Sequence, residues 1–350
     1  MRASLVSRPW AGLDLGGFSA KLFALQPGMG SVKALAAEVP YPVAATADGG
    51  PPPDVVARAI SECATRAGVS LRAMRGITVG ISGADVIVKQ IQMPLMDESE
   101  VGQALRFEAR KHLPFDPQAM VIDYQVLGRF LSERRVEVLL AAVSREHLER
   151  HLAPLSQLDL AADIVDAAPL ALTNAAVHAA GNDRGARLQL DIGHAASHLA
   201  LWQRGEPYFS RRLDFGGRHL TQAIATELQV PFEEAEEWKL AAGSDEPGFR
   251  VDWTGRELHA VHEALERELV DEVRRSLAFY RTLGHLPEQL RLLLSGATAR
   301  LPGIAERLAN LLEFPVSVFD PFADLGGAAR ARVEGGPQFT QAYGLSLRNS

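Results

Sequence analysis

The sequence predicts an α/β fold built from two related lobes around a cleft, with a small β-α-β-β unit inserted into the first lobe. The first observation is an internal repeat: LDLG at residues 13–16 recurs as LDIG at residues 190–193, 177 residues later in a chain of 350. A chain of this length exceeds what one hydrophobic core usually organises, which favours two domains. The second observation is that residues 86–150, between the copies, have a strand and helix pattern of their own.

The match between the copies continues beyond the motif without a gap. The same spacing of 177 residues separates Leu22 from Leu199 and Gly28 from Gly205. In each copy an apolar strand is followed by an Asp-x-Gly turn and a second apolar strand, which is typical of a β-hairpin. The repeat therefore predicts one hairpin per lobe, with one carboxylate at each turn.

The other elements follow from the spacing of apolar residues. The first lobe is predicted to have a hairpin over residues 11–38, a helix over 55–67 and a buried strand over 76–81. The inserted unit is predicted to have strands over 86–91, 121–127 and 136–143 and a helix over 100–112. The second lobe is predicted to have helices from residue 217, over 258–280 and over 303–312, and a strand over 290–294.

These elements divide the chain into five expected segments. They are a first lobe (1–85), the inserted subdomain (86–150), a return to the first lobe with an interdomain helix (151–185), a second lobe (186–336) and a C-terminal helix that packs back toward the first lobe (337–350).

Composition excludes several classes of protein. The net charge of −7 argues against a nucleic-acid surface, which needs clustered Lys and Arg. The single cysteine, Cys63, excludes a disulfide framework and is expected to pack as a small apolar group. No apolar run is long enough to span a bilayer, and residues 1–10 have no signal-peptide core. We therefore expect a cytoplasmic protein that meets a membrane only through a partner.

The paired turns indicate a phosphate site. Glycine lets backbone N–H groups approach phosphate oxygens, and Gly216, Gly217 and Gly296 add further turns of this kind. Asp14 and Asp191, one per lobe, could hold Mg²⁺ directly or through its waters, because hard cations take oxygen ligands. Lys21, seven residues after Asp14, could reach a phosphate from the outgoing strand.

Other candidate sites are weaker. His147 and His151 have the i, i+4 spacing of two ligands on one helical face, but lack the His-Glu-x-x-His order of a metalloprotease. We expect them to be a solvated pair, and we interpret His259 and His262 in the same way. No Gly-x-x-x-x-Gly-Lys-Ser/Thr loop is present, which disfavours a P-loop NTPase.

Four segments resemble the nucleotide-binding elements of the actin-like ATPases. Residues 12–21 (GLDLGGFSAK) resemble the first phosphate loop, and residues 190–193 resemble the second. Residues 235–239 (AEEWK) resemble the element that holds the nucleoside in bacterial members, and residues 294–297 (LSGA) resemble the adenosine turn. The resemblance implies an actin-like ATPase fold, which is a duplicated ribonuclease H-like fold around a nucleotide cleft.

Within that superfamily the chain is most similar to the PilM family of the type IV pilus inner-membrane platform. The inserted unit carries the likeness: residues 107–115 (FEARKHLPF) resemble the family's helix and proline turn, and residues 123–127 (DYQVL) resemble its Asp-Tyr strand. Residues 165–172 and 342–347 also match, so the resemblance covers about residues 11–348.

The resemblance implies that ATP with Mg²⁺ binds between the lobes. The nucleotide-binding residues would be Asp14, Gly16, Gly17, Ser19, Lys21, Asp191, Gly193, Gly216, Gly217, Glu236, Lys239, Gly296 and Ala297, with Asp14 and Asp191 also holding the metal. Asp166 is the candidate for positioning water, although it could equally be a helix cap.

The resemblance also implies a membrane-bound partner. PilM-type proteins bind a short cytoplasmic N-terminal peptide of the inner-membrane protein PilN, in a groove between the first lobe and the inserted unit. The groove residues would be Val88, Ile91, Phe107, Leu113, Phe115, Tyr124 and Val126. Further partners would be the pilus motor ATPase and other platform proteins, at the cytoplasmic face of the inner membrane.

The sequence departs from the family pattern around the phosphates. Gly17 stands where relatives place Ser or Thr, although Ser19 could compensate, and residues 194–198 lack an early hydroxyl. Ala297 and Thr298 replace glycines of the adenosine turn. We therefore expect ATP binding as a conformational clamp, with weak or no hydrolysis.

Two alternatives stay open. One is a nucleotide-independent scaffold that resembles a type II secretion protein or an FtsA-like adaptor, although FtsA-like proteins usually end in an amphipathic membrane helix that residues 345–350 do not resemble. The other is an actin-fold metabolic kinase, for which the sequence offers no convincing acceptor motif.

Overall fold

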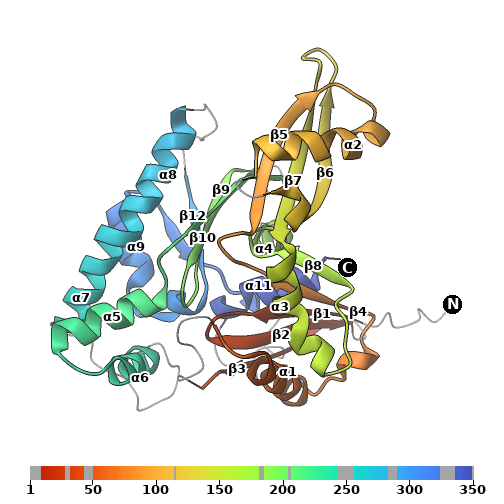
Figure 1. Ribbon diagram of the computed structural model, residues 1–350. Coiled ribbons are helices and arrows are strands. Elements are labelled where there is room, and N and C mark those ends of the chain that lie inside the picture. Colours follow the sequence, from red (N-terminus) through yellow and green to blue (C-terminus); the bar gives the residue numbers. More distant parts are fainter. Residues whose placement is uncertain are drawn as a thin grey trace.

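The computed structural model describes residues 9–27, 32–42, 50–113, 116–180, 185–203, 206–242, 256–282, 290–323 and 336–348. Two five-stranded sheets dominate the molecule, with strand orders β3-β2-β1-β4-β8 and β11-β10-β9-β12-β13. Figure 1 shows them in separate lobes, with the inserted unit rising from the first. In each sheet an antiparallel hairpin is followed by parallel strands, which is the expected duplication.

The first lobe and the inserted unit occupy the first half of the chain. The first lobe contains β1 (Trp10–Leu15), β2 (Ser19–Pro27), β3 (Val32–Pro40), α1 (Pro53–Ala67), β4 (Gly76–Ile81), α3 (Arg145–Gln157) and β8 (Ile164–Ala167). The inserted unit contains β5 (Ile87–Pro94), α2 (Glu98–Glu108), β6 (Met120–Phe130) and β7 (Arg135–Ser144), in the expected β-α-β-β order. Helix α4 (Ala168–Ala180) then leads to the second lobe.

The second lobe has the same plan with longer helices. It contains β9 (Arg187–Ile192), β10 (Ser197–Gln203), β11 (Glu206–Leu213), α5 (Gly217–Leu228), α6 (Phe232–Ala242), α7 (Arg256–Ala264), α8 (Asp271–Thr282), β12 (Leu292–Ser295), α9 (Ile304–Leu312) and β13 (Val316–Val318). The predicted helix over 258–280 is interrupted by a π-helical segment, Leu265–Val270, whose Leu265, Leu269 and Val270 stay in the core.

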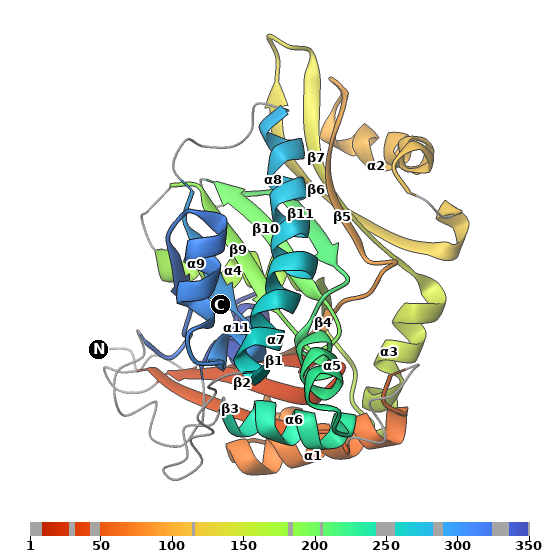
Figure 2. The ribbon, with the colours of Figure 1, turned by 90° about the vertical axis from the view of Figure 1, so that its left-hand side faces the viewer.

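Each sheet has a separate core. In the first lobe, α1 and α3 cover one face of the sheet through Ile60 and Leu155, and Cys63 lies in the same core, fully buried. In the inserted unit, α2 covers the three-stranded sheet β5-β7-β6. Helix α2 begins two residues earlier than predicted, because Asp97 and Glu100 form a capping box. The view in Figure 2 separates α2 from the lobes.

A fourth cluster joins the lobes around the C-terminal helix α11 (Thr340–Ser346). Phe23 of β2 packs against Phe322 and Tyr343, with ring centroids 5.2 Å apart in both pairs. Gly344 makes the close approach possible, because a Cβ there would lie 1.8 Å from the Ala171 carbonyl oxygen of α4. Helices α4 and α11 therefore pack tightly together and bridge the lobes, on the face of the first-lobe sheet opposite α1 (Figure 1).

Candidate functional site

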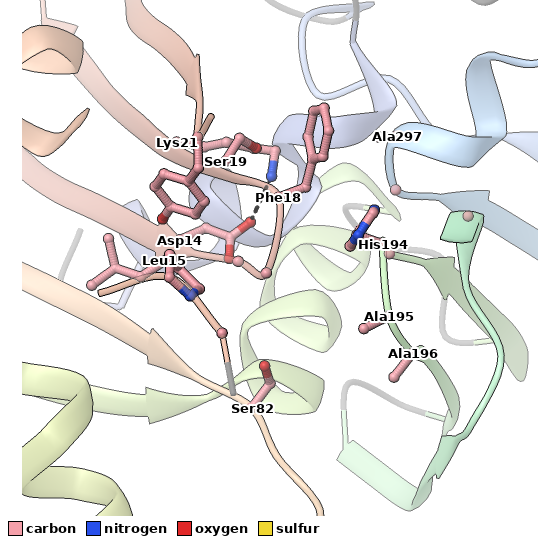
Figure 3. A pocket seen from close by; sticks show the side chains of 18 of the residues that line it. Asp14, Leu15, Phe18, Ser19, Lys21, Ser82, His194, Ala195, Ala196 and Ala297 are labelled. Atoms are coloured by element: carbon pink, nitrogen blue, oxygen red, sulfur yellow. Dashed lines mark hydrogen bonds and ion pairs between the residues drawn. The ribbon is translucent and has the colours of Figure 1, made fainter. Parts of the chain in front are cut away.

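A cavity of about 1040 Å³ lies between the lobes, and both Asp-Gly turns line it. Figure 3 shows the first turn with Asp14 and Lys21 on one side and the second turn with His194 on the other. Twelve of the thirteen predicted nucleotide-binding residues line the cavity: Asp14, Gly16, Gly17, Ser19, Lys21, Asp191, Gly193, Gly217, Glu236, Lys239, Gly296 and Ala297. Gly216 does not, because it lies behind the second turn, where a Cβ would meet the His194 carbonyl oxygen at 2.5 Å.

The two turns have the same backbone hydrogen bond. The Gly16 N–H donates to the Ser19 carbonyl oxygen over 3.1 Å, and the Gly193 N–H donates to the Ala196 carbonyl oxygen over 3.1 Å. The second turn is held further by helix α5, because the Gly217 N–H donates to the Gly193 carbonyl oxygen over 2.8 Å. The duplicated motif thus gives two turns of the same shape that face one cavity.

The first turn holds a buried cation beside two carboxylates. Lys21 Nζ lies 3.4 Å from Asp14 Oδ2 and 3.8 Å from Glu38 Oε1. Burial alone would lower the pKa of Lys21, but the carboxylates of Asp14 and Glu38 outweigh it, so the pKa is raised and the ammonium stays charged. Gln341 of α11 donates to Asp14 Oδ1 over 2.9 Å. Both oxygens of Asp14 therefore have protein partners.

Among the described residues, no Lys or Arg forms an ion pair with the carboxylate of the second turn, and the charge of Lys21 only partly opposes the rise in the pKa of Asp191. Asp191 accepts a hydrogen bond from Ser295 Oγ over 2.7 Å on one oxygen. Burial, together with the negative charge of Asp14, raises the pKa of Asp191 to about 6. His198 lies opposite Asp191 in the sheet, where Lys21 lies opposite Asp14 in the first copy. Burial lowers the pKa of His198 to about 4, so it supplies no positive charge.

The two carboxylates fit a magnesium ion whose other coordination positions are filled by a bound molecule and by water. Two buried carboxylates of different lobes interact in one cavity, and a divalent cation would relieve the cost of ionising Asp191. Within the described ranges, no group of three or more His, Cys, Asp and Glu side chains could hold a metal by itself. Phosphate oxygens would therefore have to complete the coordination.

The far wall of the cavity holds a buried polar cluster from α5 and α6. Lys239 Nζ lies 2.7 Å from Glu236 Oε2 and donates to Thr221 Oγ1 over 2.6 Å and to the Gly217 carbonyl oxygen over 3.0 Å. Burial lowers the pKa of Lys239, and Glu236 opposes that shift. The spacing of three residues between Glu236 and Lys239 places both on one face of α6, toward the cavity.

Several cavity residues escaped the sequence reasoning. Glu38 comes from β3, and Gln338 and Gln341 come from the C-terminal segment around α11. Nothing in their local sequence marks them, because each reaches the site only through packing of elements distant along the chain. Ser295, which donates to Asp191, is different, because it lies within the predicted adenosine turn at residues 294–297.

His147 and His151 are not a solvated pair, so that prediction was wrong. His147 Nδ1 lies 2.6 Å from Asp85 Oδ1, and His151 donates from Nε2 to the Gly80 carbonyl oxygen over 2.8 Å. Both residues line the cavity, because α3 packs against the first-lobe sheet at that edge. Burial lowers the pKa of His151, which favours its neutral form.

Asp166 does not lie among the cavity-lining residues. It is the third residue of β8, and Arg348 Nε, just after α11, lies 3.6 Å from its carboxylate. Burial raises the pKa of Asp166, and Arg348 partly opposes this. The position argues against contact with a bound ligand in this arrangement of the lobes.

The predicted groove residues do not form one continuous surface. Ile91 and Leu113 are buried in the core of the inserted unit, and Val126 packs against that core. Val88 lies on the opposite face of the sheet, in a small cavity shared with α4 and the second-lobe strands. The exposed members are Phe107 (69%) and Tyr124 (37%), and Phe115 lies outside the described residues.

The duplicated sheets, the paired turns and the shared cavity define a chain with the actin-like ATPase fold. Comparison with known proteins agrees. Residues 12–350 match the family described as "Type IV pilus assembly protein PilM", and the chain belongs to this family. Both the predicted fold and the resemblance on which it rested are confirmed.

Solved structures support the same conclusion. A chain of the "PilM-PilN type IV pilus biogenesis complex" matches with a TM-score of 0.80 and 29% identity, over 97% of this chain and 98% of that one. The ethanolamine utilization protein EutJ from Carboxydothermus hydrogenoformans matches with a TM-score of 0.53 and 16% identity, over 96% and 88% of the two chains. The latter likeness concerns the fold alone.

A curated relative matches part of the chain. The cell division protein FtsA of Bacillus subtilis is 27% identical over 169 residues, which is 44% of this chain and 38% of FtsA. The chain thus spans less than half the length of the curated relatives it matches. In the part of the chain that the structure describes, no helix is long and apolar enough to cross a membrane.

Proposed function

We propose that this chain is a cytoplasmic adaptor of type IV pilus assembly that binds ATP with Mg²⁺ and the N-terminal cytoplasmic tail of a PilN-like inner-membrane protein. The observation that carries the proposal is the full-length match to a chain of the PilM–PilN complex, at a TM-score of 0.80. The nucleotide would bind in the cavity between the turns, and the peptide would bind at the inserted unit.

The cavity chemistry supports ATP. Lys21 is a buried, charged ammonium at the first turn, where it can meet a phosphate. The backbone of both turns faces the same space, and Asp191 lacks a cation of its own. The Glu236–Lys239 pair offers a carboxylate for ribose hydroxyls at the other wall. Phosphates and metal would thus lie between the turns, with the nucleoside toward α6.

Hydrolysis is not needed for this role. Asp166 lies outside the cavity and is paired with Arg348, so it cannot position water without a rearrangement. ATP would act as a clamp that closes the lobes, and the peptide would bind with different affinity to the open and closed states.

Calorimetric titration with ATP and Mg²⁺ tests the nucleotide half. The wild-type chain should bind, and Asp14→Ala should weaken binding by about tenfold or more, because Lys21 and Gln341 lose their shared partner. Asp97→Ala, at the capping box of α2, is the control that should bind normally. Absence of binding heat in the wild-type chain would leave the nucleotide-independent scaffold as the better account.

Capture by an immobilised PilN-like tail peptide tests the other half. Phe107→Ala and Tyr124→Ala remove the two exposed side chains among the predicted peptide-binding residues and should weaken capture about tenfold, as expected for aromatic anchors. Leu131→Ala is the matched control, because Leu131 is similarly exposed (72%) but lies at the β6–β7 hairpin end. Equal loss in all three variants, or none, would place the groove elsewhere.

A further inference from the structure

We infer that His194 is a phosphate-binding side chain of this cavity, which donates a ring N–H to the bound nucleotide from the second turn. This inference rests on the proposed function, since it assumes a nucleotide between the turns. The second turn has no hydroxyl side chain directly after Gly193, and the imidazole of His194 would take the place of such a hydroxyl.

The position of His194 is fixed by its backbone. Its carbonyl oxygen accepts the Arg218 N–H over 2.9 Å, and the neighbouring Gly193 carbonyl oxygen accepts the Gly217 N–H over 2.8 Å. The start of α5 therefore holds the turn, while the side chain projects away from it. Figure 3 shows the His194 ring reaching from the second turn toward the first.

The ring lies where the two turns meet. Its centroid is 5.3 Å from that of Phe18, a residue of the first turn. The backbone of the first turn is also close, because a Cβ at residue 17 would lie 4.0 Å from His194 Cδ2. A phosphate held between the turns would therefore be within reach of this ring.

The imidazole is available to a ligand. Among the described residues, its ring nitrogens have no hydrogen-bond partner, although the residue lines the cavity. A neutral imidazole has one N–H donor and one acceptor nitrogen.

The surrounding charge favours an anion and keeps the ring neutral. Burial lowers the pKa of His194 to about 4, and the cations Lys239, Arg218 and Lys21 act in the same direction against Glu236. Cations therefore stand on both sides of the ring, Lys21 from the first lobe and Lys239 and Arg218 from the second, where they can meet a phosphate. Lys21 stands on β2 beside the first turn, so a phosphate would have donors from both lobes.

Titrations of the full chain with ATP, ADP and adenosine, each with Mg²⁺, test the inference. His194→Ala should weaken ATP binding by about tenfold, the size that one hydrogen bond to a charged group supports, and should leave adenosine binding unchanged. His194→Gln retains an N–H donor and should recover most of the loss. Unchanged ATP affinity in His194→Ala, or equal losses for ATP and adenosine, would overturn the inference.

Phe18→Ala is the matched control, because it removes the ring contact and keeps the donor. Because Phe18 belongs to the first turn, some loss of ATP affinity is expected, but it should be clearly smaller than the loss in His194→Ala. If it matched the loss in His194→Ala, contact between the lobes and not hydrogen bonding would explain the effect, which contradicts the inference. If the wild-type chain bound none of the three compounds, the proposed function would fail as well, whereas wild-type binding with an unaffected variant rejects His194 alone.

Discussion

At equivalent positions of the two lobes, Lys21 stands opposite Asp14 and His198 stands opposite Asp191. The backbone turns beside them are copies, since each glycine donates the same 3.1 Å hydrogen bond. Their charges differ, because the first carboxylate has a buried ammonium and the second has a neutral imidazole. The duplication therefore preserved the shape of the site and divided its electrostatic roles.

The two turns also differ in what supports them. Asp14 receives its second hydrogen bond from Gln341 on α11, at the other end of the chain. Asp191 receives one from Ser295, on the neighbouring strand of its own sheet. The carboxylate of the first turn thus depends on a hydrogen bond from α11, which bridges the lobes. The carboxylate of the second turn receives its hydrogen bond from within its own lobe.

The largest expected effect comes from displacing that bridge. Gly344→Ala places a Cβ 1.8 Å from the Ala171 carbonyl oxygen, so α11 must move and Gln341 must leave Asp14. We expect a loss of about 3 kcal/mol or more in the free energy of unfolding, measured by urea denaturation. Gly17→Ala in the first turn is the control, since its nearest neighbour would lie 4.0 Å away. Similar stability of the two variants would show that the first turn does not need α11.

The second-largest effect is expected at Asp191, the buried carboxylate of the second turn. The pKa of Asp191 is raised to about 6 in the folded chain from 3.8, so the folded state binds the proton more tightly than the unfolded state. This carboxyl therefore lowers stability as the pH rises from 4 through 6. Asp191→Asn should raise the free energy of unfolding at pH 7.5 by about 2 to 3 kcal/mol without Mg²⁺.

Denaturation of both proteins at pH 4.5 and pH 7.5 checks this expectation. The variant should gain over the wild type mainly at the higher pH, because the wild-type carboxyl is protonated at the lower one. An equal difference at both values would mean that Asp191 is not the titrating group.

A third prediction compares the residues opposite each carboxylate. Lys21→Gln removes the ammonium that meets the phosphates and should weaken ATP binding by about tenfold or more. His198→Gln removes a ring that is already neutral and should change affinity by less than about threefold. Calorimetry of the two variants measures the contrast, and comparable losses would contradict the division of roles.

The smallest effect is expected at Asp166. Asp166→Asn leaves the cavity intact, because the residue lies outside it beside Arg348. ATP affinity, followed with a fluorescent ATP analogue, should change by less than about twofold. A loss as large as that in Lys21→Gln would mean that the lobes rearrange to bring Asp166 to the nucleotide.

Most residues of the two turns could be predicted from the sequence, but fewer of the residues that surround them could be. Asp14, Asp191 and their glycines could be found because duplication left an ungapped spacing, and Glu236 and Lys239 because a helix places them together. Gln341 and Glu38 could not be found, because their contacts arise from packing between elements far apart in the chain.

In the inserted unit, the order of the elements could be predicted, but the faces to which individual side chains point could not. Its β-α-β-β order followed from apolar runs, but Val88 and Ile91 face opposite sides of the sheet, because successive strand positions alternate. The prediction that His147 is solvated failed for a related reason. A helical spacing shows that two side chains share a face, but not that the face is turned to a cavity.

The most direct test of the account is a crystal structure of the chain with Mg²⁺ and a non-hydrolysable ATP analogue. The account predicts phosphates between residues 16–19 and 193–196, with the metal on the Asp191 side and the nucleoside toward Glu236 and Lys239. A nucleotide bound elsewhere, or phosphates that contact only one of the two turns, would contradict it.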